Sequence, residues 1–272
     1  MKRLWPILLF FIGCQSRSSI IESGVSWELA EQRKASISDV RYELSFDIPK
    51  DKDDSIKAEE SINFKLSDLA NDVVLDFRQP ADHIYSVSVE GKAVPYKLVN
   101  QHIIIEASYF SKGENTIFIS FRAGDMSLNR NEEFLYTLFV PDRASTAMPC
   151  FDQPNLKAKY SLTLSMPTDW TAIANGPLQS EEVINGKRVI VFGETLPVST
   201  YIFAFTAGKF ERVTQEKDGR KMTMLHRETD LAKVERNKDE IFDLHSRAIS
   251  WMENYTGIDY PFQKFDFALI PG

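Results

Sequence analysis

The sequence predicts a mainly β protein built on a large antiparallel β sandwich, with a helical segment after it. Between Ile37 and Arg212, many short runs alternate apolar and polar side chains at a period of two, which is typical of strands with one buried face. Asn185-Gly186 separates two such runs and is a strong hairpin signal. After Asp230 the apolar side chains recur at helical spacing instead, so a helix is expected there.

The first 36 residues are predicted to be a targeting segment and a tether. A basic start precedes the apolar run Leu4–Ile12, and Gly13 follows it. This pattern is typical of a secretory signal peptide over residues 1–13 and is too short to span a bilayer. Because Cys14 comes next, we expect a bacterial lipoprotein signal with Cys14 as the lipidation site. The alternative is an ordinary signal peptide with a passive cysteine.

Residues 14–36 are then expected to be the lipoprotein tether, since the stretch after Cys14 is rich in serine. The chain is therefore expected to be exported and lipid-anchored in the bacterial cell envelope. A periplasmic or secreted protein is the alternative location.

Several alternating runs are expected to be the strands of the sandwich. One further run is short and apolar and is interrupted by Asp76. The chain has 19 Phe and 9 Tyr. We therefore expect a large β domain whose core is rich in aromatic side chains. The clearest strands are Tyr42–Ile48, Ile62–Leu66, Ile117–Phe121 and Ala158–Met166.

The predicted helix runs from Leu231 to Tyr255. Asp230 is a suitable N-cap and Gly257 a suitable C-cap. Trp251 and Met252 fall on its apolar stripe, so we expect them to be core residues rather than ligand contacts.

The segment Pro149-Cys150-Phe151-Asp152-Gln153-Pro154 predicts an ordered turn before a strand. Its two prolines fix φ and favour extended backbone in the residues before them, and Asp152 suits a turn because its side chain can bond nearby backbone. Cys150 is expected to be a buried small hydrophobe rather than a nucleophile, since the sequence shows no arrangement that activates it.

This turn resembles one in the amino-terminal domain of the aminopeptidase N family of zinc metallopeptidases, which are of the gluzincin type. That family carries Pro-Cys-Phe-Asp-Glu-Pro, so Gln153 stands here where Glu is usual. Two further segments resemble the family in the right order, Leu196–Phe205 and Tyr255–Asp266. The resemblance implies a saddle-like amino-terminal β domain over residues 37–215 and the start of an α+β catalytic domain over residues 216–272.

The resemblance also implies an exported zinc metalloaminopeptidase that removes amino-terminal residues from peptide substrates. Zinc in such enzymes is held by His-Glu-x-x-His on a helix, and none of the four histidines begins that pattern: His83, His102, His226 and His245. We therefore expect no catalytic and no metal-binding residue in this chain. The resemblance implies that zinc belongs to the full-length enzyme, whose motifs are expected beyond Gly272, and this chain alone is expected to be inactive. A fragment and a natural short protein are not distinguished by the sequence.

The family's cleft strand implies weak candidates for substrate binding at Leu138 and Val140. The family often has a Gln or Glu nine residues before the Pro-Cys turn, and Val140 occupies that place. A carboxylate or amide there helps to bind the substrate's α-amino group. Its absence leaves three alternatives open: a later Glu acts alone, the specificity differs, or a nearby acid substitutes, namely Glu132, Glu133 or Asp142.

The charge of the chain argues against a nucleic-acid partner. The formal net charge is −7, whereas binding to phosphate backbones favours a basic face. The expected partners are peptide substrates and, through the lipid anchor, a membrane. The rival function is a non-catalytic surface lipoprotein that uses the same β domain as a binding module. A sugar-binding sandwich is a weaker alternative, because Trp170 stands alone as a candidate stacking residue.

Overall fold

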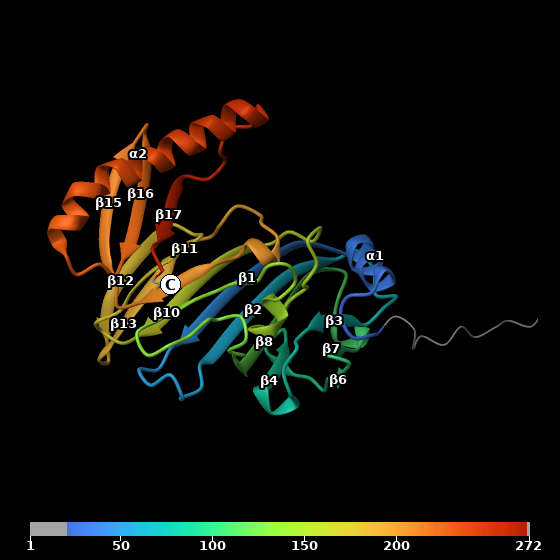
Figure 1. Ribbon diagram of the computed structural model, residues 1–272. Coiled ribbons are helices and arrows are strands. Elements are labelled where there is room, and N and C mark those ends of the chain that lie inside the picture. The colour runs from blue at the N-terminus through green and yellow to red at the C-terminus, as the bar shows by residue number, and fades with distance from the viewer. Residues whose placement is uncertain (1–20, 271–272) are drawn as a thin grey trace, which may run out of the picture.

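An eight-stranded sheet forms the body of the protein (Figure 1) in a computed structural model that describes residues 21–270. Its strand order is β12-β13-β10-β1-β2-β8-β4-β5. Neighbours are antiparallel except for β1 and β10, which run parallel. The strands are β1 (Ile37–Asp47), β2 (Lys57–Leu66), β4 (Ile84–Val89), β5 (Lys92–Ala93), β8 (Gly113–Arg122), β10 (Lys159–Met166), β12 (Leu178–Ile184) and β13 (Lys187–Phe192).

Two three-stranded sheets complete the β domain. Side chains from these two sheets and from the eight-stranded sheet form one hydrophobic core. One sheet has the order β11 (Thr171–Ala174), β14 (Phe205–Gly208), β9 (Phe134–Tyr136), and the other has the order β3 (Val73–Asp76), β7 (His102–Ile105), β6 (Lys97–Val99). Short 3-10 turns lie at Ala81–His83, Ala107–Tyr109, Ala144–Thr146 and Thr200–Ile202. The expected mainly β fold is confirmed.

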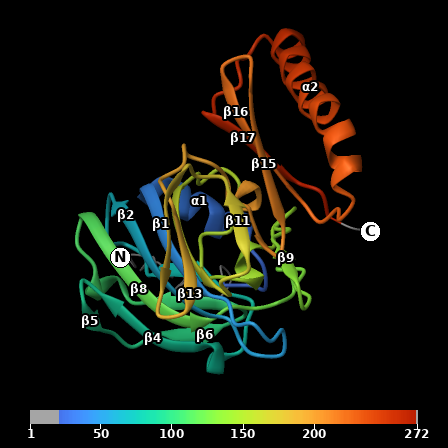
Figure 2. The same cartoon turned by 90° about the vertical axis from the view of Figure 1, so that its left-hand side faces the viewer.

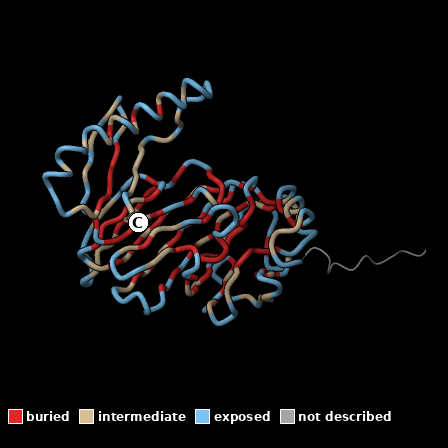
Figure 3. The backbone as a smooth tube through the Cα atoms, in the orientation of Figure 1, coloured by how far each residue is buried: buried red, intermediate tan, exposed pale blue. Residues whose placement is uncertain are grey.

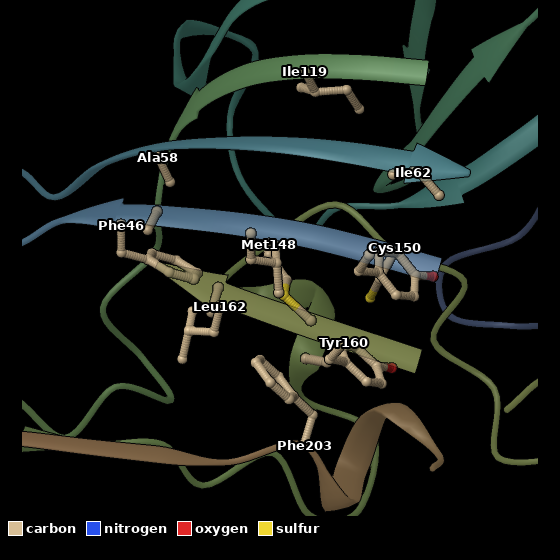
Figure 4. Packing of buried hydrophobic residues seen from close by; sticks show 14 of the residues in the cluster. Phe46, Ala58, Ile62, Ile119, Met148, Cys150, Tyr160, Leu162 and Phe203 are labelled. Atoms are coloured by element: carbon tan, nitrogen blue, oxygen red, sulfur yellow. The ribbon is translucent and has the colours of Figure 1, made fainter. Parts of the chain in front are cut away.

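Aromatic side chains fill the core beneath β1 and β10. Tyr42 and Tyr160 are paired across the two strands and stack with ring centroids 5.1 Å apart. Phe203 stacks on the other side of Tyr160 at 4.4 Å, as Figure 4 shows, with Met148 and Cys150 nearby. Stacked and tilted rings stabilise such a core beyond the area that they bury.

A smaller unit stands over one end of the β domain (Figure 2). Its sheet has the order β15 (Glu211–Lys217), β16 (Arg220–His226), β17 (Lys264–Ala268), with β16 and β17 parallel. Helix α2 (Leu231–Thr256) connects β16 to β17. The Asp230 side chain accepts a hydrogen bond from the Lys233 amide at 3.0 Å, and Gly257 has φ 68°, so both predicted caps are confirmed.

The prediction that Trp251 and Met252 are core residues is wrong. Their exposed fractions are 60% and 49%, and most of α2 is exposed in Figure 3. The helix buries Phe242, Ser246 and Ile249 instead. Only one face of α2 meets the small sheet, so an apolar side chain on the opposite face finds no cover among the described residues.

Part of the segment expected to be a tether belongs to the folded domain. Helix α1 spans Trp27–Ser36, and its Leu29 and Arg33 are buried. The polar appearance of this segment is misleading because Arg33 has a buried acidic partner, described below. The boundary expected after residue 215 falls inside β15, because both strands of that hairpin belong to the smaller unit. Cys14 lies outside the described residues, and among residues 21–270 no helix has the length and apolar character needed to cross a membrane.

Candidate functional site

A groove of about 900 Å³ lies between the β domain and the smaller unit. Residues of β11, β14 and the end of β9 line one side, and residues 260–264 and 266–268 with Ile270 line the other. Figure 1 shows β17, the last strand, close to β11. The groove is a large hollow with apolar and polar lining, which is the usual character of a ligand site.

Two cations connect the walls of the groove. Lys264 of β17 donates hydrogen bonds to the Ala174 carbonyl and to Asp266. Arg212 of β15 donates to Thr171 and, at 3.1 Å, to Glu181. The contacts to Ala174 and Thr171 join the sheet of the smaller unit to β11, and the contact to Glu181 joins it to β12.

Most of the charged side chains that line the groove are paired, and Glu181, which lies outside the lining, pairs with Arg212 of the groove. Burial alone would raise the pKa of Glu181, but the hydrogen bonds and charges of Arg212 and Arg188 lower it. Lys159 bonds Glu194 at 2.6 Å, and Asp266 accepts from the Thr223 amide at 3.1 Å. The paired charges leave no isolated acid or base among them to act on a substrate.

The segment that carries the predicted substrate residues follows β9, which ends at Tyr136 on one wall of the groove. Tyr136 and Thr137 line the groove, and the Thr137 hydroxyl accepts a hydrogen bond from the Phe205 amide at 3.0 Å. Leu138 and Val140 follow, with exposed fractions of 48% and 52%, but they do not line the hollow itself. The structure therefore places these two residues beside the groove, on the exposed continuation of its wall.

The three acids considered as substitutes for the missing anchor all have basic partners. Glu132 lies 3.6 Å from Lys52, and Asp142 accepts from Arg78 at 2.7 Å. Glu133 is paired with Arg227. An acid in an ion pair is less available to a substrate amine, so none of the three is a clear replacement.

The Pro-Cys-Phe-Asp-Gln-Pro turn is buried away from the groove wall. Asp152 accepts from the Ser145 amide at 2.9 Å and from the Thr200 hydroxyl at 2.7 Å. The second contact joins two of the segments that carry the family resemblance. Cys150 is fully buried, as expected, and burial raises the pKa of its thiol. The turn thus organises the core and offers no exposed nucleophile.

Sequence reasoning missed a buried ionic cluster formed by Arg33, Asp76 and His102. The carboxylate of Asp76 accepts from both terminal nitrogens of Arg33 and from His102 Nδ1. Burial alone would raise the pKa of Asp76, but its two basic partners lower it to about 2. The signal in the sequence was the lone Asp76 that interrupts a short apolar run, because a buried carboxylate needs a partner.

The histidines do not form a metal site. His83 contacts the Arg122 carbonyl at 3.0 Å, and His245 contacts the Ile241 carbonyl and stacks on Phe267. Within residues 21–270, no three His, Cys, Asp or Glu side chains lie together in a way that could hold a metal ion. The residues described here therefore do not fit a zinc ion.

Comparison with known proteins places this fold in a family. Residues 38–202 match the Peptidase M1 N-terminal domain. Over 210 residues the chain is 28% identical to "Probable aminopeptidase 2" of Sulfurisphaera tokodaii, which covers 74% of this chain and 26% of that protein. It is 26% identical over 259 residues to "Aminopeptidase N" of Streptomyces lividans, covering 90% of this chain and 29% of that protein.

A third relative is more similar over a shorter stretch. "Puromycin-sensitive aminopeptidase" of Caenorhabditis elegans is 35% identical over 147 residues, which are 53% of this chain and 15% of that protein. The chain thus spans less than a third of the length of each of these three relatives. The match over residues 38–202 covers more than half of the chain, so the chain belongs to the M1 peptidase family.

Proposed function

We propose that this chain is the front part of an exported zinc aminopeptidase, in which the β domain supplies one wall of a groove for peptide substrates. The observation that carries the proposal is the groove between β9, β11 and β14 and residues 260–268, in a chain whose relatives are named aminopeptidases. A peptide is long and presents polar backbone groups together with apolar and polar side chains. A groove with both apolar and polar lining therefore suits it.

Leu138 and Val140 are proposed to contact side chains of the substrate. Both are about half exposed, and both follow Thr137, whose hydroxyl is fixed by Phe205. Apolar side chains on this segment after β9 favour apolar substrate residues. Without a Gln or Glu at this place, recognition of the α-amino group is left to residues from another part of the enzyme.

Zinc would supply a polarised water for attack on the scissile carbonyl. Because no described residues fit the ion, its ligands and the general base are proposed to lie in a part of the enzyme outside this chain. The contribution of this chain is to bind and position the peptide.

The experiment is to read the coding DNA beyond the codon for Gly272 and to express the longer product beside the present chain. The longer product should contain the zinc motif and hydrolyse an aminoacyl reporter, and the present chain should not. A stop codon directly after Gly272, or hydrolysis by the present chain alone, would contradict the proposal.

The groove is tested in the longer product with Leu138→Asp and Val140→Asp. Each variant should raise KM for apolar peptides, because a carboxylate replaces apolar contact surface. Leu69→Asp is the matched control, since Leu69 is also partly exposed, at 38%, and does not line the groove. Unchanged kinetics in both groove variants would remove these residues from the proposed site.

The location is proposed to be the bacterial cell envelope, with Cys14 as the lipid-bearing residue. The basic start, the apolar run and Gly13 support this. A periplasmic or secreted protein is the alternative.

A non-catalytic binding module is the second candidate function. The observation that favours it is that the β domain has its own large core, which could persist without an enzyme attached. A peptide that binds the present chain at micromolar concentration, combined with a natural stop codon after Gly272, would support the module over the enzyme.

A further inference from the structure

The segment before helix α1 lies across the turn that leads into β7. Ile21 accepts a hydrogen bond through its carbonyl from Asn100 Nδ2 at 2.8 Å, and Ser23 Oγ donates to Gln101 Oε1 at 3.2 Å. His102 Nε2 lies 2.8 Å from the Glu22 carbonyl and 3.0 Å from the Gly24 carbonyl. We refer to residues 21–26 as the N-terminal strap.

Both ring nitrogens of His102 face hydrogen-bond acceptors. Nε2 faces the two strap carbonyls, and Nδ1 lies 2.7 Å from Asp76 Oδ1. Asp76 is itself an ionised acceptor, because Arg33 and the Asp152 amide also donate to it. A neutral imidazole has only one N–H, so only the imidazolium satisfies both sides of this ring.

We propose that His102 is a protonation-dependent latch, whose imidazolium holds the N-terminal strap on the β domain and whose deprotonation releases the strap while α1 stays docked. The charged groups that face the ring are Asp76 from β3 and Arg33 from α1. The strap itself faces the ring with backbone carbonyls, and the turn reaches the cluster through the Asp152 amide.

The bond lost on deprotonation is the one to the strap. A neutral ring that keeps its proton on Nδ1 retains the charge-assisted hydrogen bond to Asp76, which is stronger than a bond to a neutral carbonyl. Nε2 then presents a lone pair to the carbonyls of Glu22 and Gly24. Helix α1 is held independently, because the guanidinium of Arg33 stays charged and keeps both bonds to Asp76.

The direction of the pH dependence follows from the surroundings of the ring. Burial lowers the pKa of His102, but the hydrogen bond and charge of Asp76 and the bond to Glu22 raise it, and the net shift is upward from 6.5. A raised folded-state pKa means that the latch is fully stabilising below about pH 6.5 and is lost as pH rises through the folded value. Asp76 remains ionised throughout, because its pKa is about 2.

The test follows two quantities in the full chain, the titration of the His102 ring by NMR and the hydrogen exchange of strap amides. The ring should titrate above 6.5. The opening constant of the strap, after correction for intrinsic exchange rates, should rise between the low-pH and high-pH limits by about tenfold for each unit by which the pKa of the ring with the strap closed exceeds its pKa with the strap open. Amides of α1 should show no comparable rise and are the internal reference.

Variants separate the latch from general effects of pH. In His102→Gln the opening constant of the strap should be the same at the low-pH and high-pH limits, because Gln does not titrate in this range. His83→Gln is the matched control and should behave as the wild type, since His83 contacts the Arg122 carbonyl and not the strap. A His102 ring that titrates at or below 6.5, or a wild-type strap with equal protection at both limits, would overturn the proposal. Both measurements use the wild type, so they decide it even if His102→Gln fails to fold.

Discussion

Arg33 and Asp76 form a two-point ion pair inside the protein. Arg33 Nη1 lies 2.8 Å from Asp76 Oδ2, and Nη2 lies 2.7 Å from Oδ1, with side chains only 2% and 4% exposed. The guanidinium also stands over the Phe151 ring at 5.5 Å. One pair thus connects α1, the end of β3 and the Pro-Cys turn, which are far apart in sequence.

Removal of the acid in this pair should destabilise the fold strongly. Asp76→Asn keeps the shape but leaves Arg33 charged and buried, and breaking such a pair costs about 3–5 kcal/mol. Urea unfolding should show a clearly lower midpoint. Glu240→Gln is the control, because its pair with Arg247 is more than two-thirds exposed on both sides, and it should leave the midpoint unchanged. A midpoint for Asp76→Asn equal to that of the control would show that the pair contributes little.

Glu60 should make stability depend on pH. The side chain is 1% exposed on the core face of β2, and among residues 21–270 neither of its oxygens has a hydrogen-bond partner. Burial raises its pKa well above the usual 4.5, so the folded state holds a proton that the unfolded state releases. From about pH 4.5 upward, this one group should lower the free energy of unfolding by about 1.4 kcal/mol per pH unit until it ionises in the fold.

Denaturant unfolding between pH 4 and 8 measures this slope. Glu60→Gln should flatten the profile, because the amide has no proton to lose in this range. Glu59→Gln should keep the wild-type slope, since Glu59 is the exposed neighbour on the same strand. Equal slopes for both variants would mean that Glu60 is not the titrating group.

Cys150 should react slowly with a thiol reagent in the folded protein. Its side chain is fully buried and its thiol pKa is raised by burial, so little thiolate is available and access is closed. The measurement uses a Cys14→Ser background, which leaves Cys150 as the only cysteine of the chain. Labelling should be much faster in denaturant, and equal rates with and without denaturant would contradict burial in solution.

Cys14 is expected to carry the lipid anchor in a bacterial host. Cys14→Ser should move the protein from the membrane fraction to the soluble fraction, because the modified thiol is lost. Ser16→Cys is a useful control, since this variant keeps Cys14, adds a cysteine two places on and should stay in the membrane fraction. A wild type that is already soluble in the periplasm would favour the ordinary signal peptide.

Limited proteolysis should cut the smaller unit before the β domain. The small unit has a buried core of Met222, Met224, Phe242 and Ile249, and α2 leaves Trp251 and Met252 exposed on its other face. An element with few buried apolar contacts opens at low free energy. Mass spectrometry should find a stable product that keeps α1 and ends before β15, over about residues 27–210, whereas a stable product that retains residues 222–270 would contradict this order.

The sequence by itself determined the local elements of this protein. Alternation at a period of two located strands such as β10, Asn185-Gly186 located the hairpin between β12 and β13, and Asp230 and Gly257 marked the ends of α2. These signals are local, because a strand face, a tight turn or a helix cap depends on residues within a few positions of each other.

Only the tertiary structure decided which side chains meet. Arg33, Asp76 and His102 come from α1, β3 and β7, and nothing in the spacing of these residues pairs them. The same limit explains Trp251, since a helical pattern shows that an apolar stripe exists but not whether a sheet covers it. It also explains the groove, whose walls come from β11 and β17, nearly a hundred residues apart. Partner choice depends on the packing of distant segments, because burial and charge compensation are properties of the assembled core rather than of any short stretch of chain.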